Sequence, residues 1–390
     1  MLPKKISEII NNNVKIISKK LDFKKDFFGD SPSPFIGRYG YPNVNVGILS
    51  AIDYKNKEEL DNPKLWSSQQ KNISEIVNIR STLINSRFKS NIYKKQEKLN
   101  ELTQEIALAS APVEVEVNLK DKPHFKLNTY SHATPTGPNA DLEKAKITSN
   151  PKINTKVDKV FSDTDLKAEQ ALNYLYERGI DENQLSQILS VGAVGLKYNR
   201  KLVPTRWGIT ATDDMLGKKR ITEIKDFNVL DTYQVYFGGY LGNYYLILFF
   251  PEIWSYELFE MSLKYTNSCS TDYEFYNGRT KYSESCEGGY YTVRLAISDK
   301  LKTMKKQALA LALRFITPEY NAPLGVWVTR ESARKALNSK PLELSSKELM
   351  LKYVKHLINK KFNYNVENLL KESILLNKLR TQKKLIKFIK

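Results

Sequence analysis

Apolar residues recur at helical spacing in several stretches of this chain. The first stretch is basic and covers residues 1–28, which we predict to form an amphipathic helix. Its apolar face consists of Ile6, Ile9, Ile10, Ile17 and Leu21. Further helices are predicted at residues 65–109, 165–176, 182–191, 300–315, 330–337 and 346–360, followed by a tail helix that begins near residue 366.

Other stretches have the pattern of strands. Residues 113–119 alternate apolar and polar side chains, which predicts a half-buried strand. Residues 208–295 are rich in Tyr, Phe and β-branched residues and are predicted to be mostly β. Strands are expected at 235–237, 244–250 and 290–297, within 143–160 and at 323–329. The chain is therefore predicted to have an α+β fold of mixed helices and antiparallel strands.

Two stretches lack either periodicity. Glycine and proline crowd residues 29–47, so we predict a backbone held in set turns there, and neither a helix nor a strand. Residues 130–140 form a second irregular stretch. The predicted organisation is the N-terminal helix at 1–28, two closely associated domains at 29–270 and 285–365, and a basic helical tail at 366–390.

The charge of the chain narrows its possible partners. Its 390 residues include 61 Lys and Arg against 43 Asp and Glu, a formal net charge of +18. Such an excess favours a polyanion, either nucleic acid or an anionic membrane face. No run of about 18 apolar residues occurs, so we favour nucleic acid and expect no membrane partner. Solvated surface lysines and an AT-rich genome are an alternative source of part of this charge.

Cysteine and histidine are scarce. Cys269 and Cys286 are too few for a four-cysteine zinc site. They are either reduced thiols, the default in the cytosol, or one bridge that closes a loop. His132, in the irregular stretch 130–140, is a candidate catalytic residue. The alternative is structural, because a lone histidine is more often a hydrogen-bonding group than a catalyst.

The segment 31–43 combines turn residues with Arg38, Tyr39 and Tyr41. Turns expose backbone N–H groups, a guanidinium is a planar fork suited to phosphate, and tyrosine rings stack on bases. We therefore predict that these three residues bind nucleic acid. The alternative is a rigid surface loop in which Arg38 pairs with a carboxylate.

The segment 202–214 is the second candidate. Arg206 beside Trp207 combines charge with stacking and favours contact with nucleic acid or a nucleotide. Asp213 and Asp214 are candidates for a general base, but neighbours on a strand point apart and an Asp also serves as a helix N-cap. No metal site is predicted. An alternative hypothesis is an enzyme acting on nucleotides or nucleic acid, with a pocket formed by Arg38, His132, Arg206, Trp207, Asp213 and Asp214.

The end of the sequence has the spacing of a peptide that binds a sliding clamp. Gln382 is followed by an aliphatic residue, Leu385, and an aromatic residue, Phe388, at intervals of three. One turn of 3₁₀-helix puts such residues on one side, where the apolar ones share a pocket. Clamp peptides usually end in two aromatic residues, so Ile389 in the second place predicts weaker binding. The alternative is the amphipathic end of the tail helix.

Three blocks of the sequence resemble those of the archaeal Nre (NreA) family. They are Ser33-Pro-Phe-Ile-Gly-Arg38-Tyr-Gly-Tyr-Pro42, Leu202-Val-Pro-Thr-Arg206-Trp207-Gly-Ile-Thr-Ala-Thr-Asp213-Asp214 and Pro323-Leu-Gly-Val-Trp327-Val-Thr-Arg330. The resemblance implies that 29–270 and 285–365 are the N-terminal and C-terminal domains of the family. It implies a DNA-repair protein of an archaeal cytoplasm, associated with the nucleoid.

The resemblance also implies partners. Members of this family are regarded as binding DNA and the archaeal sliding clamp (PCNA), the latter through a C-terminal peptide. The residues that match this peptide are Gln382, Leu385, Phe388 and Ile389. Many relatives carry a Cys-rich N-terminal segment suited to zinc, which this chain lacks, so no structural zinc is expected. The resemblance implies no cofactor and assigns no catalytic residue.

Removal of the tail is predicted to abolish capture by a sliding clamp. The intact chain and a chain ending at Thr381 are incubated with immobilised clamp, and retention is measured. We expect retention of the intact chain only, because the shortened chain lacks Gln382, Leu385 and Phe388. Equal retention of the two chains would contradict the clamp interpretation.

Overall fold

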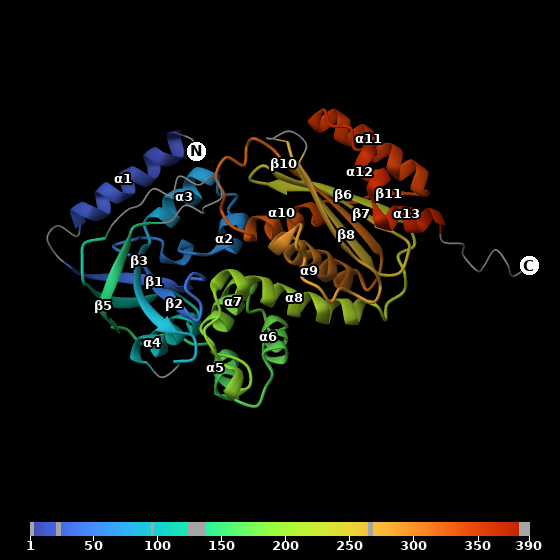
Figure 1. Ribbon diagram of the computed structural model, residues 1–390. Coiled ribbons are helices and arrows are strands. Elements are labelled where there is room, and N and C mark those ends of the chain that lie inside the picture. Colours follow the sequence, from blue (N-terminus) through green and yellow to red (C-terminus); the bar gives the residue numbers. More distant parts are fainter. Residues whose placement is uncertain (1–3, 21–24, 95–96, 124–136, 264–267, 382–390) are drawn as a thin grey trace, which may run out of the picture. The chain divides into compact units, whose positions relative to one another are not determined.

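The computed structural model describes residues 4–20, 25–94, 97–123, 137–263 and 268–381 (Figure 1). The predicted α+β class is confirmed, because helices accompany two mostly antiparallel sheets. The chain forms two compact units. Unit 1 contains residues 1–216 and 321–325, and unit 2 contains residues 217–320 and 326–390. These units are defined by contacts within the structure, so they do not test the predicted domain limits at residues 28, 270, 285 and 365, which stay a prediction.

Unit 1 is built on a closed five-stranded barrel. Its strands are β1 (Asp26–Ile36), β2 (Asn43–Ala51), β3 (Ile84–Asn91), β4 (Val113–Leu119) and β5 (Asn139–Ile147). β1 closes the barrel because its first half pairs with β4 and its second half with β2. The order is β1-β2-β3-β5-β4, with β3 and β5 parallel and helix α4 (Lys98–Leu108) between β3 and β4. This is the topology of an OB-fold.

The prediction of an irregular 29–47 was wrong, since most of this stretch belongs to β1 and β2. Pro32 lies where the register between β1 and β2 shifts, and at such a bulge a residue without an N–H is tolerated. Val44, Val46 and Ile48 are fully buried, which is the alternation of a strand that the glycines and prolines obscured. Only residues 37–42 form the predicted turn.

The helices of unit 1 lie around this barrel. α1 (Lys4–Lys20) packs on α3 (Ile73–Ser81), and the Asn13 amide donates to the Ser81 hydroxyl over 2.5 Å. The predicted helix at 1–28 ran too far, because β1 begins at residue 26. The predicted helix at 65–109 is instead α2 (Pro63–Ser68), α3, β3 and α4. The remaining helices are α5 (Thr155–Ser162), α6 (Ala168–Tyr176) and α7 (Glu182–Ser190), of which the last two were predicted.

Helix α8 (Thr205–Ile224) carries the chain from unit 1 into unit 2. Unit 2 contains a six-stranded sheet in the order β11-β6-β7-β10-β8-β9, in which β10 and β8 are parallel. Its strands are β6 (Tyr233–Tyr240), β7 (Asn243–Phe250), β8 (Ser255–Ser262), β9 (Cys269–Glu274), β10 (Leu309–Ile316) and β11 (Leu342–Leu344).

Helices cover both faces of this sheet (Figure 1). One face is covered by α9 (Glu287–Met304) and α10 (Trp327–Leu337). The other is covered by α11 (Lys347–Phe362), α12 (Glu367–Glu372) and α13 (Ile374–Thr381). Because both faces are covered, β10 is buried along almost its whole length. Such a strand has no polar alternation.

This burial explains several wrong predictions in unit 2. The strand predicted at 290–297 lies within α9, where residues 289–298 are buried without interruption and no polar face marks the helix. The helix predicted at 300–315 is the end of α9 followed by β10. Residues 208–295 were predicted to be mostly β, but this stretch begins within helix α8. The strand predicted at 323–329 is absent, because α10 begins at Trp327. The strands predicted at 235–237 and 244–250 are confirmed within β6 and β7.

A buried ion pair joins the sheet of unit 2 to α9. The Arg294 guanidinium donates to the Glu274 carboxylate over 2.9 Å, and their side chains are 1% and 0% exposed. The same carboxylate accepts hydrogen bonds from Trp254 and Tyr290. A buried ion pair with further hydrogen bonds of this kind is costly to break, because either charge left alone stays desolvated.

The substitution Glu274→Ala is predicted to destabilise the protein by about 3–5 kcal/mol, because the Arg294 charge stays buried without this partner. The free energy of unfolding is measured by urea denaturation followed by circular dichroism. The control is Glu367→Ala, which removes the exposed pair with Lys355 and is expected to have little effect on stability, because water screens that pair. Similar losses in the two variants would contradict the role assigned to burial.

Candidate nucleic-acid interface

The turn between β1 and β2 presents two tyrosine rings. Residues 37–42 form this turn, and the Asn43 N–H closes it by donating to the Gly40 carbonyl over 2.8 Å. Gly40 has a φ of +83°, and a Cβ there would lie 2.7 Å from the Asn43 carbonyl oxygen. Only glycine fits this position without strain. Tyr39 and Tyr41 flank it and are both exposed.

Arg38 contacts Tyr39 directly. Its guanidinium donates to the phenolic oxygen over 3.1 Å and lies 5.0 Å from the ring centroid. This hydrogen bond and the charge of Arg38, with a smaller contribution from Arg206, lower the pKa of Tyr39. A phenol is neutral at physiological pH, so this contact leaves the positive charge of Arg38 uncompensated. The observed partner of Arg38 is thus a phenol and not the carboxylate of the alternative interpretation.

The segment that precedes α8 meets the same end of the barrel. Leu202 is buried in one cluster with Ile36, Val44, Val46 and Ile92. The Ile36 N–H donates to the Thr205 hydroxyl over 2.9 Å. Two residues further on, the Trp207 ring lies 5.4 Å from the Tyr41 ring, centroid to centroid, at an interplanar angle of 53°.

Two segments far apart in the sequence therefore form one exposed surface. We call it the aromatic–basic surface, and it consists of Arg38, Tyr39, Tyr41, Arg206 and Trp207. These are the five residues predicted to bind nucleic acid. The structure brings them together within unit 1, whereas their role stays a prediction.

Two residues that the sequence did not single out flank this surface. The Ile92 N–H donates to the Pro42 carbonyl and the Leu202 N–H to the Ile92 carbonyl, both over 3.0 Å. These bonds place Tyr93 and Lys201 beside the turn, with the ammonium 5.9 Å from the ring centroid. Lys201 directly precedes the segment 202–214, whereas nothing in the sequence places Tyr93 near it, because that proximity depends on the barrel.

The aspartates predicted as catalytic lie elsewhere. Asp213 and Asp214 are in the middle of α8, neither on a strand nor at an N-cap. Asp213 is fully buried, about 10 Å along the helix axis from Arg206. His132 lies outside the described residues. Arg38, Arg206 and Trp207 thus lie together, but the buried carboxylate of Asp213 is not exposed beside them. The enzyme alternative stays a hypothesis. Among the described residues, no group of three His, Cys, Asp or Glu side chains is arranged to hold a metal ion.

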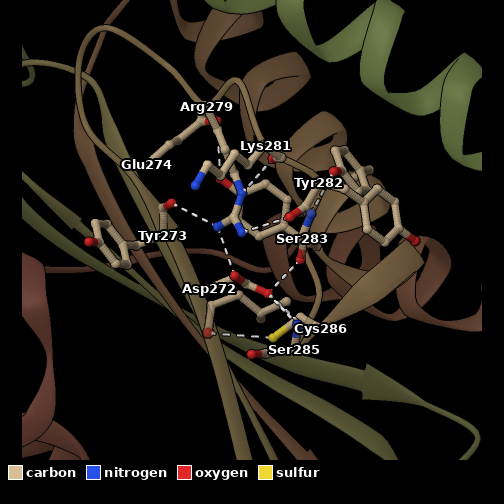
Figure 2. Close-up of polar contacts among 12 residues, drawn as sticks. Asp272, Tyr273, Glu274, Arg279, Lys281, Tyr282, Ser283, Ser285 and Cys286 are labelled. Carbon is tan, nitrogen blue, oxygen red and sulfur yellow. Dashed lines mark hydrogen bonds and ion pairs between the residues drawn. The ribbon is translucent and has the colours of Figure 1, made fainter.

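A second polar cluster lies in unit 2, where Asp272 holds the loop between β9 and α9 (Figure 2). One carboxylate oxygen accepts from the Ser283 hydroxyl over 2.6 Å and from the N–H groups of Ser285 and Cys286. The other pairs with Arg279 over 2.7 Å. Arg279 also donates to the backbone carbonyl groups of Lys281 and Tyr282 in this loop and of Tyr273 in β9. With its oxygens bonded in this way, Asp272 has a structural role at the start of α9.

Neither cysteine has the environment of a nucleophile. Both thiols are free, and Cys286 is buried whereas Cys269 is exposed. Desolvation, followed by the charges of Glu260 and Asp272, raises the pKa of Cys286 well above its usual range. Desolvation and the charge of Glu372 raise the pKa of Cys269 to about 11. Since the thiolate is the reactive form, both thiols are poorly activated.

The family described as "Archaeal Nre, N-terminal" matches residues 4–267, and "Archaeal Nre, C-terminal" matches residues 274–388. "DNA repair protein NreB" of Archaeoglobus fulgidus is 34% identical over 92% of this chain and 91% of its own length. "DNA repair protein NreA" of the same organism is 36% identical over 84% of this chain and 82% of its own length.

"DNA repair protein NreA" of Haloferax volcanii is 35% identical over 79% of this chain and 77% of its own length. No solved structure matches the chain. The three blocks that carry the resemblance lie within the two matched regions. Across the described ranges, none of the helices combines the length and apolar character needed to span a bilayer.

Thiol titration is predicted to distinguish the two cysteines. In the native chain, we expect Ellman's reagent to modify Cys269 alone, and slowly, because roughly one thiol in a thousand is ionised at pH 8 when the pKa is about 11. The rate should rise as the pH approaches 11. Cys286 should react only in the unfolded chain, and Cys269→Ser should remove the native reaction. Rapid modification of both thiols at pH 8 would contradict this assignment.

Proposed function

The chain belongs to the archaeal Nre family, and on that premise we propose that it is a DNA-repair factor that contacts DNA through the aromatic–basic surface. Three relatives that align over most of their length are named DNA repair proteins. These names support a role in DNA repair.

The observation that carries the proposal is the convergence of two segments on one exposed surface. Arg38 and Arg206 supply positive charge beside three exposed rings. Guanidinium groups bind phosphate through two parallel hydrogen bonds, and aromatic rings contact bases and sugars. A surface that only stabilised the fold would bury these rings, since their burial is favourable.

The charge of the whole chain supports the same partner. A formal net charge of +18 creates a positive field that attracts a polyanion. Binding through Lys and Arg releases counterions from DNA, so the affinity falls steeply as salt rises. The slope of log K against log salt therefore reports the number of phosphate contacts that the chain makes.

We also propose that the tail docks on a sliding clamp. Gln382, Leu385, Phe388 and Ile389 lie outside the described residues, so this proposal rests on their spacing and on family resemblance. The helix before them is well anchored. Glu257 in β8 accepts hydrogen bonds from the Ser373 hydroxyl and from two N–H groups at the start of α13. A clamp contact and a DNA contact in one chain would act as a bivalent tether.

The double substitution Arg38→Gln with Arg206→Gln tests the DNA contact. DNA affinity is measured by fluorescence anisotropy between 50 and 200 mM salt, which are about the limits over which counterion release is resolved. For a chain that has lost two phosphate contacts, the slope of log K against log salt should become less negative by about 1.5 to 2.

The matched control is Arg178→Gln on α6. Arg178 is also exposed and also lies over a tyrosine ring, 3.6 Å from the centroid of Tyr174, but it is not part of the aromatic–basic surface. We expect its slope to equal that of the unmodified chain. An unchanged slope in the double variant would contradict the assignment of this surface. Absence of DNA binding by the unmodified chain would contradict the proposed DNA contact as a whole.

A further inference from the structure

We infer that the ligand of the aromatic–basic surface is an unpaired DNA strand, whose bases stack on the exposed rings and whose path continues over the outer face of β2 and β3. This inference rests on the proposed function and names the form of DNA that the surface selects.

The exposure of the rings favours a single strand. Trp207 is 46% exposed, whereas Trp66, Trp254 and Trp327 are 0%, 0% and 8% exposed. Tyr39 and Tyr93 are 76% and 66% exposed. In a duplex, the faces of the bases are already stacked on each other, so exposed rings gain little from it. An unpaired strand offers free base faces, and stacking of bases on aromatic side chains is the usual basis of single-strand binding.

Two of the rings contact each other before any ligand binds. Tyr41 and Trp207 form a tilted pair with centroids 5.4 Å apart. Preorganised rings lose little conformational freedom on binding, so more of the stacking energy appears as affinity.

The outer face of β2 and β3 continues from this turn. Asn43 pairs with Asn91 and Asn45 with Lys89 in the register of the two strands. Asn43, Asn45 and Lys89 are exposed, and the Asn91 amide donates to Asn43 over 2.8 Å. Amide side chains can donate and accept at base edges, and Lys89 adds a charge for phosphate.

On this face the Asn85 side chain lies over Gly47, where a Cβ would be 1.9 Å from the Asn85 side-chain oxygen. By analogy of topology, OB-fold barrels bind oligonucleotides on strands β2 and β3 and on the β1–β2 and β4–β5 loops. The β1–β2 turn and the β2–β3 face of this chain occupy the corresponding places.

Tryptophan fluorescence provides a direct test. The chain has four tryptophans, and Trp207 is the one with substantial exposure, so quenching on binding reports stacking at this residue. The full-length chain is titrated with oligo(dT) of about 12 nucleotides, a typical length for one OB-fold, and with a duplex of the same length. We expect quenching by oligo(dT) and at least about tenfold tighter binding of oligo(dT) than of the duplex.

Variants separate stacking from folding. Trp207→Ala should weaken oligo(dT) binding by about tenfold, whereas Trp207→Phe should retain most of the affinity and lose the signal. The control is Phe28→Ala, which removes a ring that is 60% exposed on the part of β1 that pairs with β4. Its affinity should be unchanged.

The outcomes distinguish this inference from the proposed function. If oligo(dT) and duplex bind equally, without quenching, and Arg38→Gln with Arg206→Gln weakens both, the single-strand inference is overturned and the DNA contact stands. If neither form of DNA binds, both are overturned. Tighter binding of oligo(rU) than of oligo(dT) overturns the choice of DNA as the ligand and supports an RNA-binding role instead.

Discussion

The aromatic–basic surface depends on the burial of Leu202 at one end of the barrel. Leu202 fills the space between Ile36 of β1 and Ile92 after β3, and its N–H bonds to the Ile92 carbonyl over 3.0 Å. This contact holds the segment before α8 against the barrel, so that Trp207 reaches Tyr41. An apolar contact inside the fold thus decides which polar and aromatic side chains meet outside it.

Arginine side chains have two kinds of environment in this protein. In unit 2, arginine is buried against carboxylate, as in the pairs Arg294–Glu274 and Arg314–Glu260. Such pairs hold elements together, because neither charge can be left alone in a desolvated position. In unit 1, Arg38 is exposed and its contact is a phenol. The same type of side chain therefore stabilises the sheet at Arg294 and Arg314 and presents an exposed positive charge at Arg38.

The residues of the candidate site were easier to single out from the sequence than the fold around them. Arg38, Tyr39, Tyr41, Arg206 and Trp207 are marked by their chemistry, since guanidinium groups pair with phosphate and aromatic rings stack on bases. The strands that carry them were missed because the prolines and glycines of 29–47 outweighed the alternation of Val44, Val46 and Ile48. Part of helix α9 was predicted to be a strand, and strand β10 was predicted to be part of a helix, for a different reason. Both are buried on all sides, so neither has the polar positions that distinguish a period of 3.6 from a period of two.

The sequence by itself determined the α+β class, the family and the residue types suited to nucleic acid, because these depend on composition and on local blocks of sequence. Only the tertiary structure decided that residues 38–41 and 206–207 form one surface and that Tyr93 and Lys201 flank it. It also decided that Asp213 is buried in α8. The physical reason is that these positions depend on the closure of the barrel by β1 and β4 and on the burial of Leu202, and both bring together residues that are distant in the sequence.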